Sequence, residues 1–151
     1  MLIPETTFNL FESLMPLASV NAIISNEKNE VLIVKRNIKP AKNLYWFPGG
    51  IIKKGQTFQE ALQDEIQEEL GLKWSNLEIV KLLNVASCRF ETRHTIEINF
   101  LLRIKQDTKI QLNKEHSEYQ WIKPENLEKE GFHSYLKWVL EGNWGNFIFD
   151  F

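Results

Sequence analysis

The stretch between Thr57 and Gly71 limits what this chain can fold into more than any other part of the sequence. Its apolar residues recur at helical spacing, Thr57 is a residue type that caps helix N-termini, and Gly71 suits the turn that ends a helix. The spacing therefore predicts a helix. At about 100° per residue, Glu65 and Glu69 fall within its apolar arc and Glu68 falls at the rim of that arc.

Carboxylates on the buried face of a helix cost free energy unless a basic partner, a proton or a metal compensates their charge. The helix contains no lysine or arginine that could do so. Three clustered carboxylates are the oxygen ligands that Mg²⁺ and Mn²⁺ prefer. The segment Trp46–Gly50 and the turn at Gly55 can also bring backbone groups close to a polyphosphate. The sequence favours a divalent-cation site, and the alternative is a solvated acidic face.

Alternation of apolar and polar residues, together with turn residues, predicts the other elements. They are a helix within residues 1–16, strands over 17–25 and 31–36, a short apolar stretch at 44–47, long strands over 77–90 and 95–105, a shorter strand over 119–122, helices near 125–130 and 133–141, and an aromatic tail made of Trp144, Phe147, Phe149 and Phe151. This order predicts an α/β sandwich with a mixed β-sheet.

Length and charge exclude several classes of protein. A chain of 151 residues has room for a single domain over residues 1–151. Lys and Arg total 18 against 20 Asp and Glu, which offers no basic field for nucleic acid or a membrane surface. Cys88 is the only cysteine, and no apolar run approaches the length of a membrane span. We expect a cytoplasmic protein without nucleic-acid or membrane partners.

Seven residues of the helical stretch and its flanks carry a family resemblance. They are Gly50, Glu65, Ile66, Glu68, Glu69, Gly71 and Leu72. Their spacing resembles the Nudix box, which reads Gly-x5-Glu-x7-Arg-Glu-U-x-Glu-Glu-x-Gly-U, with U an aliphatic residue. The resemblance implies a Nudix-type α/β/α sandwich that hydrolyses a nucleoside diphosphate linked to another moiety. It also implies a bound Mg²⁺ or Mn²⁺, with Glu65, Glu68 and Glu69 as ligands and Glu65 as a catalytic residue.

Two positions depart from the box. Gln56 stands in place of a glutamate and Asp64 in place of an arginine that helps to hold the catalytic glutamates in the family. Gln56 and Asp64 can still hydrogen-bond to each other, which would support the metal ligands without an ion pair. Alternatively, Lys53 or Lys54 supplies the missing positive charge.

Within the family the chain most resembles the GDP-mannose mannosyl hydrolases. That likeness implies metal coordination by the Gly49 carbonyl, Glu69 and Glu115, with His116 as a catalytic base and Arg36 as a substrate contact. Tyr45 and Arg93 are further candidates for substrate binding, and core packing or a plain surface position is the alternative for each. The likeness also implies a homodimer, with the helix of residues 1–16 at its interface.

Other residues depart from that subgroup. Glu65 and Glu68 are kept here, whereas the subgroup has lost both, and Ile51 and Asn21 replace its arginine and aspartate. Attack at the sugar carbon C1 and attack at phosphorus therefore both stay open. So do two further functions: a general pyrophosphohydrolase of nucleoside triphosphates, ADP-ribose or dinucleotides, and a nucleotide-binding protein without catalysis.

Overall fold

A mixed β-sheet forms the centre of the computed structural model, which describes residues 3–106 and 108–149. Its strands are β1 (Leu17–Ser25), β2 (Val31–Arg36), β3 (Tyr45–Trp46), β4 (Gly49–Ile51), β5 (Leu77–Arg89), β6 (His94–Ile104), β7 (His116–Ile122) and β8 (Gly145–Ile148). The order is β3-β2-β1-β6-β5-β8, with β4 also paired to β1 and β7 to β2.

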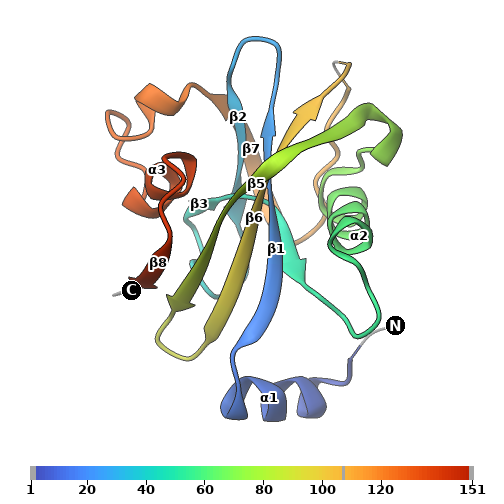
Figure 1. Ribbon diagram of the computed structural model, residues 1–151, viewed down its shortest axis with the longest axis vertical. Coiled ribbons are helices and arrows are strands. Elements are labelled where there is room, and N and C mark those ends of the chain that lie inside the picture. Colours follow the sequence, from blue (N-terminus) through green and yellow to red (C-terminus); the bar gives the residue numbers. More distant parts are fainter. Residues whose placement is uncertain (1–2, 107, 150–151) are drawn as a thin grey trace.

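The α-helices are α1 (Glu5–Leu14), α2 (Phe58–Leu70) and α3 (Ser134–Leu140), and two short 3₁₀ helices span Trp74–Asn76 and Pro124–Asn126. Helices α2 and α3 lie on opposite faces of the sheet, and α1 lies across one end of the molecule, the lower end in Figure 1. One hydrophobic core lies between the sheet and α2, and a second lies between the sheet and α3. This arrangement confirms the predicted α/β sandwich with a mixed sheet. None of the helices in the described ranges combines the length and apolar character needed to cross a lipid bilayer.

The central strands β1 and β6 are parallel and covered on both faces, which explains why β1 is apolar almost throughout. Val20, Ala22 and Ile24 of β1 point toward the α2 core, whereas Ile23 belongs to the α3 core. Because side chains alternate along a strand, Ser19 and Asn21 lie on the α3 side as well. Both polar residues are buried.

Helix α2 is capped at both ends as its sequence predicts. Thr57 and Glu60 form a reciprocal capping box, and Gly71 adopts the left-handed conformation with φ of 66°. The helix buries Leu62, Ile66 and Leu70 against the sheet. These contacts set both the rotation and the ends of α2, and they determine where its glutamates lie.

The C-terminal part differs from the sequence prediction. The expected helix near 125–130 is a 3₁₀ helix over Pro124–Asn126 followed by turns, and β7 begins three residues earlier than expected, at His116. The aromatic tail contains a strand, β8, which pairs in parallel with β5. Phe151 of the predicted tail lies outside the described residues, as do residues 1 and 2 of the predicted N-terminal element.

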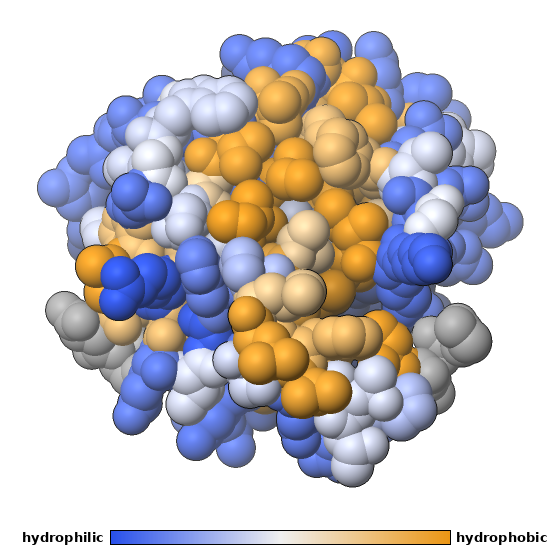
Figure 2. Space-filling view, turned by 60° about the horizontal axis from the view of Figure 1, so that its bottom comes forward, coloured by the Kyte–Doolittle hydropathy of each residue, from blue (hydrophilic) through white to orange (hydrophobic). Residues whose placement is uncertain are grey.

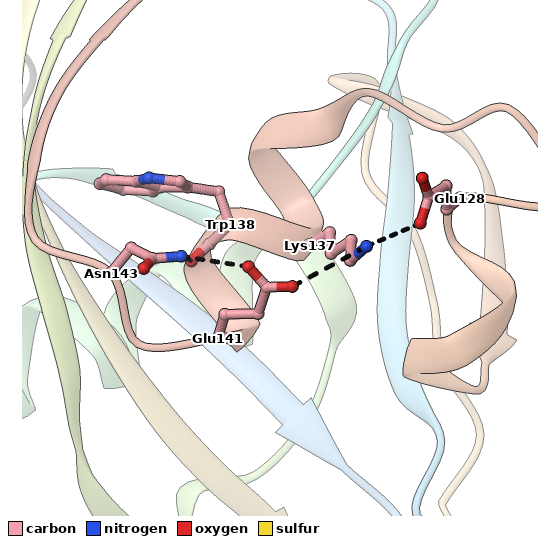
Figure 3. A network of polar contacts seen from close by, with 5 residues as sticks. All are labelled: Glu128, Lys137, Trp138, Glu141 and Asn143. Carbon is pink, nitrogen blue, oxygen red and sulfur yellow. Dashed lines mark hydrogen bonds and ion pairs between the residues drawn. The ribbon is translucent and has the colours of Figure 1, made fainter.

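Helix α3 carries a small polar network on its outer side (Figure 3). Lys137 Nζ lies 2.6 Å from Glu128 Oε2 and 3.9 Å from Glu141 Oε1. The amide of Asn143 donates to the Trp138 carbonyl and to the Glu141 carboxylate, at 3.1 and 3.2 Å. These bonds connect the helix to its flanking turns.

Candidate active site

Glu69 is a carboxylate in the protein interior, with 2% of its surface exposed. Its Oε2 accepts a hydrogen bond from the Gly49 amide of β4 at 3.2 Å. Burial raises the pKa of Glu69 well above its usual range, and the nearby charges of Glu65 and Glu115 raise it further. The wheel prediction that Glu69 points inward is confirmed.

Glu65 lies one helical turn before Glu69 and faces the second glycine of the same strand. A Cβ on Gly50 would lie 2.3 Å from Glu65 Cδ, so only glycine lets the carboxylate approach β4 this closely. Burial raises the pKa of Glu65 to about 7, while Lys53 lowers it, with Nζ 4.0 Å from Glu65 Oε1. Lys53 thus provides a positive charge near the carboxylates, as one of the two alternatives predicts.

The other alternative, a hydrogen bond between Gln56 and Asp64, is also present. Gln56 Nε2 donates to Asp64 Oδ2 at 2.8 Å, and Gln56 Oε1 accepts from the Lys53 amide at 2.8 Å. The two residues that depart from the box therefore still connect the loop before α2 to the helix. Where the Nudix box has a glutamate and an arginine, this chain has a hydrogen bond between the Gln56 amide and the Asp64 carboxylate. Glu65 and Glu69 still face β4.

A cavity of about 370 Å³ opens beside these carboxylates. Gly49, Gly50, Lys53, Glu65 and Glu115 line the part of it that we call the acidic end. Four polar residues of the sheet strands β1 and β6 form what we call its floor, namely Ser19, Asn21, Thr95 and Glu97. Its apolar lining residues include Ile3, Phe8, Ile38, Pro40 and Phe90.

Two arginines also line the cavity. The Arg36 Nε donates to the Pro40 carbonyl at 2.6 Å, which fixes the guanidinium against the 36–41 loop. Burial lowers the pKa of Arg36, while the charges of Glu69 and Glu115 raise it, so this arginine lies within the field of both carboxylates. Arg93 forms an ion pair with Glu12 of α1. Of the two, Arg36 is the one placed to contact an anionic ligand next to the glutamates.

The acidic end of the cavity fits a divalent cation by the chemistry of its donors. Glu65 and Glu69 both have a raised pKa because burial disfavours their charge, and a cation would supply the missing compensation. Across residues 3–106 and 108–149, no three His, Cys, Asp or Glu side chains already stand in coordinating positions. Glu65, Glu69 and Glu115 are close enough to interact electrostatically, but their carboxylates do not surround a common point.

Glu69 lies behind Gly49, which lines this cavity, and is not itself a lining residue. Three other predicted residues, Glu68, Tyr45 and His116, also lie outside the lining. Glu68 is exposed on α2. Tyr45 donates its hydroxyl to Glu118 Oε2 at 2.8 Å and packs edge-on against Phe132, so it does not reach the cavity as a substrate contact should. His116 is buried in β7, where burial lowers its pKa to about 4 and its Nδ1 has no hydrogen-bond partner among the described residues.

Residues that the sequence did not single out also contribute to the cavity. Glu97 lies on its floor, and Phe8 of α1 is one of its apolar lining residues. A carboxylate between Ile96 and Ile98, in a strand with several apolar residues, is a signal that could have pointed to Glu97. Helical spacing predicts Phe8 on the apolar face of the N-terminal helix, but it does not show that Phe8 reaches a cavity.

Comparison with known proteins places this site in context. The pattern of the NUDIX domain family matches residues 15–140. The ADP-ribose pyrophosphatase of Methanocaldococcus jannaschii is 37% identical over 93 residues, covering 60% of this chain and 53% of that protein. The low-salt glycan biosynthesis protein Agl8 of Haloferax volcanii is 25% identical over 147 residues, covering 92% and 89%.

A second enzyme and a solved structure are also similar to this chain. The nucleoside triphosphatase NudI of Escherichia coli is 30% identical over 87 residues, covering 52% of this chain and 61% of that protein. The chain thus spans about half to three fifths of the length of the pyrophosphatase and of NudI. Among solved structures, a MutT protein of Methanosarcina mazei superimposes with a TM-score of 0.74 at 26% identity, covering 85% and 93%.

Proposed function

The chain belongs to the NUDIX family, and from this membership we propose that it is a divalent-cation-dependent hydrolase of a nucleoside diphosphate linked to another moiety. The observation that carries the proposal is the packing of Glu65 and Glu69 against the two glycines of β4, at the edge of a cavity that also holds Arg36 and Lys53. Buried acids beside basic groups in one cavity are typical of sites that bind metal and phosphate.

We assign the metal to Glu65, Glu68, Glu69, Glu115 and the Gly49 carbonyl, as the family resemblance implies. Glu68 is exposed and would join the set by a change of side-chain rotamer. When bound, the cation neutralises charge on the pyrophosphate oxygens. Mg²⁺ and Mn²⁺ both fit an all-oxygen donor set.

The chain's own groups then have separate tasks. Arg36 and Lys53 bind phosphate oxygens, since both are cationic and line the cavity. Glu69 stays oriented by the Gly49 amide. We propose that Glu65 takes the proton from the attacking water, as the family resemblance implies, because its carboxylate lines the cavity beside the proposed cation site. His116 is the weaker candidate for this task, because it is buried away from the cavity lining.

For the substrate, we place ADP-ribose and nucleoside triphosphates ahead of GDP-mannose. The names of two relatives, an ADP-ribose pyrophosphatase and a nucleoside triphosphatase, favour general pyrophosphohydrolase activity. GDP-mannose is the second candidate, because Arg36 and Glu115, two residues through which the chain resembles the mannosyl hydrolases, both line the cavity.

Turnover of ADP-ribose, GTP, a dinucleotide and GDP-mannose with Mg²⁺ or Mn²⁺ tests these assignments. Hydrolysis in ¹⁸O-labelled water then identifies the bond that breaks. Label in a phosphate product means attack at phosphorus, whereas label in free mannose means attack at C1. If no substrate is hydrolysed with either metal, the enzymatic proposal is wrong, and equilibrium binding of the same nucleotides tests the binding-protein alternative.

We further propose that the chain is a single domain that forms a homodimer through α1. Leu10, Phe11, Leu14 and Met15 on and next to this helix are exposed, at 55%, 43%, 71% and 54%. Figure 2, which brings the α1 end forward, shows apolar residues gathered across the middle of this face. Light scattering at micromolar concentration tests the proposal, and a monomer would contradict it.

A further inference from the structure

A row of polar side chains lies on the sheet face that forms the floor of the cavity. Thr95, Glu97 and Asn99 alternate along β6 and are buried, while Ile98 between the last two packs against the α2 core. In the parallel register, Ser19 of β1 is opposite Glu97 and Asn21 is opposite Asn99. Four members of this row line the cavity, namely Ser19, Asn21, Thr95 and Glu97. The proposed catalytic machinery uses none of them.

Glu97 is the member of this row whose presence needs an explanation. It is 5% exposed and makes no ion pair in the described part of the chain. Its protein partners are neutral donors: Asn21 Nδ2 at 2.9 Å, Tyr135 OH at 2.5 Å and Thr95 Oγ1 at 3.2 Å. The Arg36 guanidinium acts on Glu97 electrostatically without forming an ion pair with it. A buried carboxylate whose hydrogen-bond partners are all neutral still costs free energy, and an apolar residue would pack there more favourably.

The two oxygens of Glu97 differ in their surroundings. Oε2 accepts from both Asn21 and Tyr135, and Tyr135 belongs to the α3 core and does not line the cavity itself. Oε1 accepts from Thr95, which itself lines the cavity. The thiol of Cys88 is a further, weak donor to the Glu97 carboxylate. A carboxylate oxygen has room for about two hydrogen bonds. Oε1 therefore keeps acceptor capacity for a further donor.

We propose that Glu97 is the specificity-determining acceptor of the cavity, hydrogen-bonding to a donor group in the part of the ligand beyond the pyrophosphate. Two ligand sources offer such donors to a fixed carboxylate: the N1–H and 2-amino edge of a guanine-type base, and the hydroxyl pair of a sugar. This inference rests on the proposed function, because it takes the cavity as the nucleotide site. Asn21 and Thr95 act as positioning residues that hold the carboxylate.

The chemistry predicts which ligands are rejected. An adenine edge presents a ring acceptor where guanine presents a donor, and two acceptors facing each other leave both unsatisfied. A 2-deoxy sugar lacks one of the two hydroxyl donors. Sites built to bond a polar group discriminate strongly against analogues that lack it, because the buried protein group is then left unpaired.

The test is equilibrium binding with Mg²⁺ of two ligand pairs, GMP against AMP and ribose 5-phosphate against 2-deoxyribose 5-phosphate. We expect the wild type to prefer the first member of one pair by at least about tenfold, the size of one hydrogen bond to a charged group. In Glu97→Gln the preference should fall below about threefold. The pair that shows the preference identifies the base or the sugar as the source of the donor.

Tyr135→Phe is the matched control, because it removes a donor from Glu97 on the core side without changing the cavity lining. It should keep the ligand preference. Equal loss in both variants, or no preference in the wild type, would overturn the inference in favour of a purely structural network. If Glu97→Gln does not unfold cooperatively, Glu97→Met takes its place, because it removes the acceptor without burying an amide. Its ligand preference should also fall below about threefold.

These probes contain no pyrophosphate bond, so the result does not depend on turnover. A chain that hydrolyses nucleotides but binds both members of each pair equally contradicts only the role of Glu97. A chain that discriminates between them but hydrolyses nothing contradicts the proposed enzymatic function and leaves the role of Glu97 intact.

Discussion

Glu69 shows at the scale of a single residue how burial and charge together create a site. The carboxylate contacts the Gly49 amide and has Glu65 and Glu115 close enough to raise its pKa. A buried carboxyl group is tolerated when it is protonated or when a cation lies next to it. Without a proton or a cation, its buried negative charge destabilises the fold. Its substitution should therefore affect function and stability in opposite directions.

For Glu69→Gln we expect kcat/KM to fall by at least about 10²-fold, the loss typical of removing one pre-organised charge contact. The amide has nearly the same shape and no charge to bury, so the free energy of unfolding should stay the same or rise. Steady-state kinetics and urea denaturation measure the two effects. Glu78→Gln, which removes an exposed carboxylate from β5, should change neither, and retained activity in Glu69→Gln would contradict its role as a metal ligand.

The glycine pair of β4 offers a comparison between two neighbouring residues. A Cβ on Gly49 would lie 2.1 Å from the Val20 carbonyl oxygen, which is backbone, whereas a Cβ on Gly50 meets the Glu65 side chain. We expect Gly49→Ala to lower the free energy of unfolding by about 1–3 kcal/mol, because strand pairing must yield. Gly50→Ala should mainly lower activity, because a side chain can rotate away.

Thermal unfolding and kinetics of the two alanine variants separate these effects. A Gly50→Ala variant with wild-type turnover would show that the close approach of Glu65 to β4 is not needed for catalysis.

At the scale of elements, α1 lies before residue 15, where the family pattern begins, yet it contributes to the cavity. Phe8 lines the cavity, and its ring lies 5.4 Å from the Arg93 guanidinium carbon, while Glu12 pairs with the same arginine. Arg93 thus holds the helix against the end of β5 and β6. A helix outside the range that the family pattern matches thus contributes a side chain to the cavity lining.

Phe8→Ala should raise KM by about fivefold with little change in kcat, since the lost apolar contact is worth about 1 kcal/mol. Leu14→Ala on the same helix is the control, because Leu14 is 71% exposed and does not line the cavity. Initial rates over a range of substrate concentrations measure both variants. Equal KM values for Phe8→Ala and the wild type would mean that α1 does not touch the substrate.

Helix α3 provides a pH-dependent prediction. The Nδ1 of its N-cap, His133, accepts from the Tyr135 amide at 3.1 Å, and burial lowers the pKa of His133. Because the folded pKa lies below the unfolded value of about 6.5, the unfolded state binds more protons in the window just below 6.5. The free energy of unfolding should therefore fall as the pH drops through this window.

His133→Asn keeps a capping acceptor that does not titrate, so its unfolding free energy should vary less between pH 7 and pH 5. Urea denaturation at several pH values measures the difference. The same pH dependence in the wild type and in His133→Asn would assign the effect to other groups.

At the scale of the whole molecule, cation binding should be coupled to folding. The carboxylates that would hold Mg²⁺ come from α2 and from the loop before β7, and these segments are brought together only in the folded chain. A ligand that binds only the folded state at 100 times its Kd stabilises it by about 2.7 kcal/mol. For a chain of this length that corresponds to roughly 5–10 °C in Tm.

We therefore expect Mg²⁺ to raise Tm by this amount, EDTA to reverse the shift, and Glu69→Gln to abolish most of it. Calorimetry at constant ionic strength, with Na⁺ in place of Mg²⁺ as the control, makes the measurement. A Tm that is insensitive to both Mg²⁺ and Mn²⁺ would count against a cation site.

Much of the fold and part of the site follow from local sequence patterns. The capping residues of α2, the inward direction of Glu65 and Glu69 and the two long strands β5 and β6 could all be predicted, because each depends on residues within one element. Such patterns reflect the short-range geometry of helices and strands. They do not depend on what lies across the sheet.

Only the tertiary structure placed the residues that act across elements. The sequence could not show that the aromatic tail pairs with β5 or that Tyr45 turns toward Glu118. It could not show that Asn21 and Glu97, 76 positions apart, share one hydrogen bond beneath the cavity. The reason is physical: a polar residue in a strand follows the same local pattern whether it faces water, a partner or a ligand, and only the packing of distant segments decides among these.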